Sequence, residues 1–353
     1  MRSAGGSGAA ARQRPRAASL ALPTALIVLA LTALTLLVVA PAAGGPAPEH
    51  ALPALDDTAA GLLLAHGGSD AAGASLVRAL HQGGQVLLYV GILGTTGLVL
   101  FRHLVLDPAA AALRLLRPTA QLTAVGLVGL LLFLVADGAW LVGSGAAGLV
   151  DPDLLWHSLT SRTGAATVLG AGGLALALVA RGRAAATVGA ALALASLPLT
   201  GHTRSFGPAW LVVGSDVLHV LAGSLWFGGL LGLFLTLRSP AVDTPAAART
   251  VARFSTAAAW LVLTLAVSGT LLAWRILPGP AALGTTGYGL TLLAKVATVG
   301  CVLAVAAWNR FRLVPRVAGS GSRSLLRRTV GVEAAVLLLA LSLTGVLVSQ
   351  SPS

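Results

Sequence analysis

The feature that most constrains this chain is a series of apolar runs, each close to the length that crosses a membrane. They cover about residues 20–40, 83–101, 118–142, 163–180, 184–201, 209–237, 251–276, 287–309 and 330–349. A helix of about 20 apolar residues spans the hydrocarbon core, and a helix satisfies its own backbone hydrogen bonds there. The sequence therefore predicts an all-α protein, a polytopic transmembrane bundle of eight or nine helices in contact with the lipid bilayer.

Composition supports a membrane protein and argues against a separate soluble domain. Of the 353 residues, 56% are hydrophobic and 10% are charged, whereas soluble domains carry about 25% charged residues. The formal net charge of +12 does not predict nucleic-acid binding, because the basic residues lie in short loops between apolar runs.

The distribution of these basic residues predicts the orientation. If the N-terminus is inside, 18 of the 23 basic residues lie in the inner segments, as the positive-inside rule requires. The outer segments hold three, Arg78, Arg162 and Arg204. We therefore expect a multi-pass protein of the cytoplasmic membrane, with its N-terminus inside and its C-terminus outside.

The chain divides into three parts. Residues 1–45 are a basic segment followed by an apolar run that is either a first transmembrane helix or a signal peptide, because Ala40-Pro41-Ala42 matches a cleavage pattern. Residues 46–82 are predicted to form a polar outer loop, which includes His81. Residues 83–350 are predicted to form the helix bundle.

Ionisable residues inside the apolar runs concentrate toward the outer side. They include Asp137, Asp216, His219 and Lys295, and such residues are by default hypotheses for a functional site. Two interpretations remain open: a polar cavity open to the outside, or structural ion pairs such as Asp216 with Lys295. Glu333 is the exception, near the inner surface.

The run at 209–237 is the most informative segment. Asp216, His219, Gly223 and Trp226 share one stripe of a helix. Asp216 can accept a hydrogen bond from one imidazole nitrogen of His219 and leave the other nitrogen for a metal. His202, at the outer end of the preceding run, could turn toward His219. The alternative is that His219 is only a polar tie between helices.

These positions predict a metal site of His202, His219 and Asp216. A supporting polar cluster is formed by Asp137, Lys295, Tyr288 and Trp226, with Lys295 assigned to charge balance. Imidazole and carboxylate groups suit copper, zinc, iron or nickel. The single cysteine, Cys301, is interpreted as a small buried apolar residue. No catalytic motif occurs in a fitting context, so an enzyme is not expected.

Five stretches resemble the copper resistance protein D family in sequence, order and spacing. They are DVLHVLAGSLWFGGLLGL (216–233), LTGHT (199–203), RFSTAAAWLVLTLAVSGTLLAWRIL (253–277), YGLTLLAK (288–295) and WNRFRLVP (308–315). The resemblance covers about residues 85–349. It implies an inner-membrane protein that handles copper ions, together with an extracytoplasmic copper-binding partner of the copper resistance protein C type.

The resulting expectation is copper ion transport, import or homeostasis across the cytoplasmic membrane through an outward-facing His/Asp site. Two alternatives remain open. One is a membrane redox protein that binds one haem or quinone, and the other is a non-catalytic accessory subunit whose polar groups only hold the bundle together.

Overall fold

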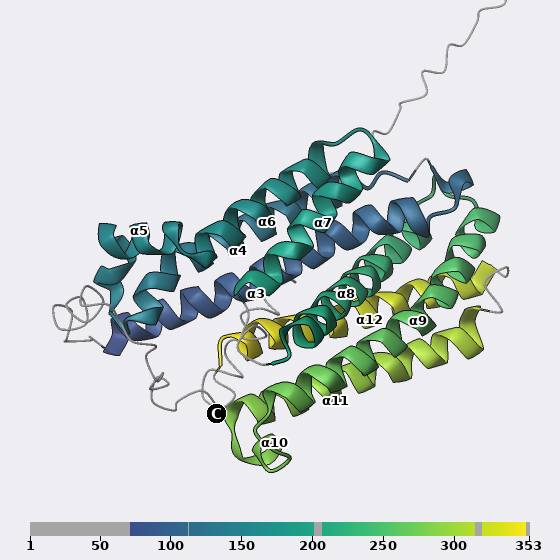
Figure 1. The fold of residues 1–353 in the computed structure, drawn as a ribbon. Coiled ribbons are helices and arrows are strands. Elements are labelled where there is room, and N and C mark those ends of the chain that lie inside the picture. Colours follow the sequence, from purple (N-terminus) through teal and green to yellow (C-terminus); the bar gives the residue numbers. More distant parts are fainter. Residues whose placement is uncertain (1–70, 112, 201–206, 315–319, 351–353) are drawn as a thin grey trace, which may run out of the picture.

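The computed structural model describes residues 71–111, 113–200, 207–314 and 320–350, and within these ranges the chain forms helices and no strand. Eight helices are long and apolar enough to cross a membrane, which confirms the predicted all-α bundle (Figure 1). They are α3 (Ala71–Leu104), α4 (Leu116–Leu141), α6 (Arg162–Val179), α7 (Arg183–Thr200), α8 (Ala209–Arg238), α9 (Thr244–Ile276), α11 (Gly287–Trp308) and α12 (Ser320–Val348). The first apolar run, residues 20–40, lies outside the described residues.

Short elements connect the long helices. They are a 3-10 turn at Pro108–Ala110, a second at Ala146–Val150, α5 (Pro152–Thr160) and α10 (Ala282–Thr285). The chain after α11 winds into a π-helix at Asn309–Leu313. Figure 1 shows α5 and α10 at the same end of the bundle.

Several helices are longer than the apolar runs that predicted them. α3 begins at Ala71 rather than at residue 83, so the last part of the expected outer loop is helical and His81 lies inside the bundle. α9 begins at Thr244 rather than at residue 251, because Asp243 caps its N-terminus by accepting a hydrogen bond from the Ala246 N–H at 2.7 Å.

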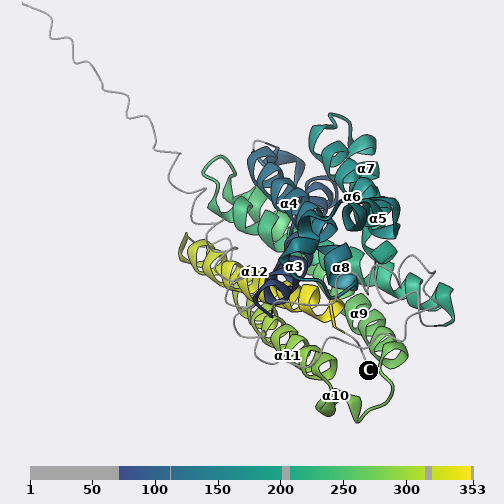
Figure 2. The same cartoon turned by 90° about the vertical axis from the view of Figure 1, so that its left-hand side faces the viewer.

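α3 forms the centre of the bundle. It packs against α4, α8 and α12, while α9 packs mainly on α8 and α11 mainly on α12. The apolar part of α3 is buried almost throughout, whereas α9 and α11 bury very little of theirs. Their exposed side chains, among them Trp260, Leu263 and Val296, are suited to face lipid. Figures 1 and 2 both place α9 and α11 on the same side of the bundle.

Glycines set the contact between α3 and α8. A Cβ atom built on Gly228 would lie 2.2 Å from the carbonyl carbon of Gly97, and one built on Gly232 would lie 2.3 Å from the ring of Phe101. The two helices can approach this closely only because Gly228 and Gly232 carry no side chain. Beside this contact, the Thr96 and Ser224 hydroxyls lie 2.7 Å apart.

Arginines gather where α3, α6, α8 and α11 end, and we call this the arginine-rich end. Arg323 of α12 donates hydrogen bonds to carbonyl oxygens at the last turn of α8 and in the loop after it. These acceptors are Thr236, Leu237, Ser239 and Val242. A cation at this position also complements the helix dipole of α8.

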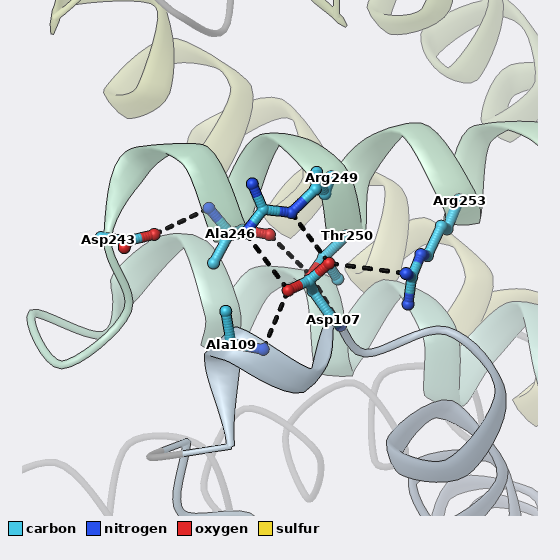
Figure 3. A network of polar contacts seen from close by, with 7 residues as sticks. All are labelled: Asp107, Ala109, Asp243, Ala246, Arg249, Thr250 and Arg253. Atoms are coloured by element: carbon cyan, nitrogen blue, oxygen red, sulfur yellow. Dashed lines mark hydrogen bonds and ion pairs between the residues drawn. The ribbon is translucent and has the colours of Figure 1, made fainter.

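A second contact ties the turn after α3 to α9 (Figure 3). The Asp107 carboxylate accepts a hydrogen bond from Arg249 Nε at 3.0 Å and lies 3.5 Å from Arg253 Nη2. The backbone N–H of Asp107 donates to Thr250 Oγ1 at 3.2 Å. The hydrogen bond from Arg249, followed by one from the Ala109 N–H, holds the pKa of Asp107 below its usual value.

Candidate metal site

His219 lies in α8, in the half of the helix farther from the arginine-rich end, and its side chain is half-buried. Its Nδ1 atom lies 3.0 Å from the Ser268 hydroxyl oxygen on α9. That hydroxyl donates its single proton to the Thr264 carbonyl oxygen at 2.6 Å. Ser268 therefore accepts from His219, so Nδ1 carries the ring proton and Nε2 keeps a lone pair that can bind a metal.

Gly269 lets α9 approach the imidazole ring. A Cβ atom built on Gly269 would lie 3.1 Å from His219 Cε1, closer than a side-chain carbon normally packs. Ser268 and Gly269 therefore fix the ring by a hydrogen bond and by contact. Neither residue was predicted from the sequence, although a Ser-Gly pair inside an apolar run was a visible signal.

Asp216 was expected to hold the His219 ring, but the structure gives that role to Ser268. The charge of Asp216 instead acts on Tyr288 and Lys295 of α11 and on Tyr89 of α3. Lys295 also acts electrostatically on His219. Asp216 thus interacts electrostatically with Tyr288 and Lys295, and Lys295 in turn with His219.

Asp137 belongs to a different group. Its Oδ1 atom lies 3.7 Å from Nε2 of His81, and the two residues are only 7% and 4% exposed. The His81 ring stacks on Trp140 with centroids 5.0 Å apart and packs against Phe133 at 4.9 Å. His81 was predicted to lie in the outer loop. It lies within the bundle instead, because α3 begins at Ala71.

Trp226, the fourth member of the expected supporting cluster, points elsewhere. It is buried and lines a cavity of about 340 Å³ together with Asn309 and Glu333, toward the arginine-rich end. Cys301 was interpreted as buried, but it is exposed on α11. The reason is that α11 buries little of its surface, so a small apolar residue there faces outward.

His202 lies outside the described residues, so the structure does not place it. In the part of the chain that the structure describes, no group of three or more His, Cys, Asp or Glu side chains is arranged to hold a metal ion. Among the described residues, the structure orients the His219 imidazole through Ser268, and Asp216 lies three residues earlier on the same helix.

Comparison with known proteins gives two matches. A model of the family described as Copper resistance protein D matches residues 248–347, which contain most of α9 and α12 and all of α11. Copper resistance protein D of Pseudomonas syringae pv. tomato is 34% identical over 136 residues, covering 35% of this chain and 42% of that protein. The match thus spans less than half of the relative's length. No solved structure matches the chain. In the region of these matches, the chain is therefore similar in sequence to the copper resistance protein D family.

Proposed function

We propose that this membrane protein carries copper ions across the cytoplasmic membrane as part of copper homeostasis, with Nε2 of His219 as a copper ligand. The observation that carries the proposal is the pair of hydrogen bonds through Ser268, which leaves Nε2 as the unprotonated nitrogen. The family match and the relative's name support copper as the metal.

The chemistry of the site is consistent with a transported ion. An imidazole nitrogen is a good ligand for copper, and the hydrogen bond at Nδ1 orients the ring for binding. A transport site must also release its ion, so it binds less tightly than a closed structural site. We propose Asp216 and His202 as the further groups at the site, with Lys295 balancing the charge of Asp216.

The arginine distribution supports an orientation in which the arginine-rich end faces the cytoplasm. His219 then lies in the outer half of the membrane, where an extracytoplasmic copper-binding protein of the copper resistance protein C type could deliver the ion. Exposed tryptophans near the other end of the bundle support a membrane boundary there, since Trp is enriched at interfaces. They are Trp156, Trp210 and Trp274.

The test is copper accumulation in cells that express the parent chain or a variant at matched membrane levels. His219→Ala should abolish the copper-dependent effect of the parent, and Asp216→Asn should weaken it less. His103→Ala is the matched control, because His103 lies beside Arg183 at the arginine-rich end and should leave copper handling unchanged. Equal copper accumulation in His219→Ala and the parent would contradict the proposed site.

A further inference from the structure

The cavity of about 340 Å³ near the arginine-rich end is separate from the proposed copper site. α8, α9, α12 and the end of α11 with its π-helix line it, and Trp226, Phe254 and Leu230 contribute apolar walls. A volume of this size is typical of small-molecule sites, which are mostly apolar with a few polar groups. The polar groups here are few and lie together, which indicates where the head group of a ligand would bind.

Two buried side chains form this polar wall. Asn309 and Glu333 are only 5% and 3% exposed, and the Asn309 amide N–H donates a hydrogen bond to Glu333 Oε1. The Asn309 Oδ1 atom is buried and has no hydrogen-bond partner. A buried acceptor without a donor is unfavourable, so this oxygen favours a ligand that brings an O–H or N–H group.

The π-helix at Asn309–Leu313 places this amide in the cavity. Such wide turns are rare and are frequently found at functional sites. Arg310, one residue further on, donates to the carbonyl and hydroxyl oxygens of Ser255 on α9. This contact joins α9 to the π-helix beside the cavity, at the arginine-rich end.

The lining of the cavity includes exposed residues on α9 and α11. Ala259 and Ala307 line the cavity from these two helices and are both exposed. α9 and α11 pack mainly on other neighbours, α8 and α12 respectively. Because both helices lie on the lipid-facing side of the bundle, we expect a ligand to reach the cavity from the membrane.

The occupant must therefore dissolve in lipid, present a flat apolar body to Trp226 and Phe254, and donate a hydrogen bond. Copper and zinc ions fit poorly, because the wall offers an amide and a carboxylate but neither imidazole nor thiolate. We propose that this cavity binds a lipid-soluble hydroquinone, whose ring O–H group donates to Asn309 Oδ1. This proposal does not depend on the copper site.

Binding can be tested with the full chain in lipid nanodiscs by titration calorimetry under anaerobic conditions. The probes are a short-chain hydroquinone and its dimethyl ether, which has the same ring but no donor. The hydroquinone should bind about fivefold more tightly or better, since satisfying one buried acceptor corresponds to at least a factor of this size. Equal affinities, or no binding of either probe, would overturn the proposal.

Variants locate the effect. Asn309→Leu should reduce the hydroquinone's affinity to that of the ether, and the double variant with Glu333→Leu should do the same without leaving the carboxyl group unpaired. Phe311→Leu, at the exposed edge of the cavity, is the control and should keep the preference. A preference unchanged in both Asn309 variants would refute the assignment. His219→Ala should bind hydroquinone like the parent, so this result separates the two sites.

Discussion

Replacing Gly228 by alanine tests whether the close contact of α3 and α8 holds the bundle together. The new Cβ atom would lie 2.2 Å from the carbonyl carbon of Gly97, whereas carbon atoms pack at about 3.5–4.0 Å. The two helices must therefore move apart by more than an ångström, and overpacking of this kind costs about 1–3 kcal/mol.

Gly223→Ala is the matched control, on the same helix. A Cβ atom at Gly223 would have its nearest neighbour, Leu93 Cδ2, at 3.7 Å, which is an ordinary contact. Both variants gain the same intrinsic helix propensity of about 1 kcal/mol, so their difference isolates the clash. Denaturation followed by circular dichroism in a mild detergent measures it. If Gly228→Ala were as stable as Gly223→Ala, the α3–α8 packing described above would be wrong.

Two further predictions concern polar contacts. Ser268→Ala should weaken copper binding by about 10–100-fold, as expected when the partner that orients a ligand is lost. The control Thr264→Val keeps the Ser268 hydroxyl and should weaken copper binding less. Competition with a chelator measures both affinities, and equal effects of the two variants would contradict the role assigned to Ser268. Because the pKa of Asp107 is lowered in the folded protein, its ionised carboxylate stabilises the fold at pH values above the usual carboxyl pKa. This stabilisation is lost as the pH falls through the lowered pKa. Asp107→Asn should therefore reduce the melting temperature at pH 7 more than at pH 3, and an equal reduction at both would argue against the ion pairs with Arg249 and Arg253.

The sequence predicted the spans well, because a lipid-crossing helix must be continuously apolar. Their ends were less predictable. Residues 71–82 are rich in small and polar side chains and were predicted to be a loop. In the structure they form the first turns of α3, before its apolar run begins. Asp243 begins α9 before its apolar run by capping the first turn.

The polar contacts show a different limit. The spacing of Asp216 and His219 suggested a local partner, since both lie on one helix. The partner found, Ser268, is 49 residues away in the chain, and only the packing of α8 against α9 brings it into contact. Helix packing also brings together two other pairs that are far apart in the chain, Asp107 with Arg249 and Asn309 with Glu333.

The central claim, that His219 binds copper, can be tested by X-ray absorption at the copper edge on the copper-loaded protein in nanodiscs. We predict imidazole scattering in the parent and in His103→Ala, and a weaker imidazole signal in His219→Ala at equal protein folding. An unchanged imidazole signal in His219→Ala would show that another histidine binds the metal and would contradict the proposed site.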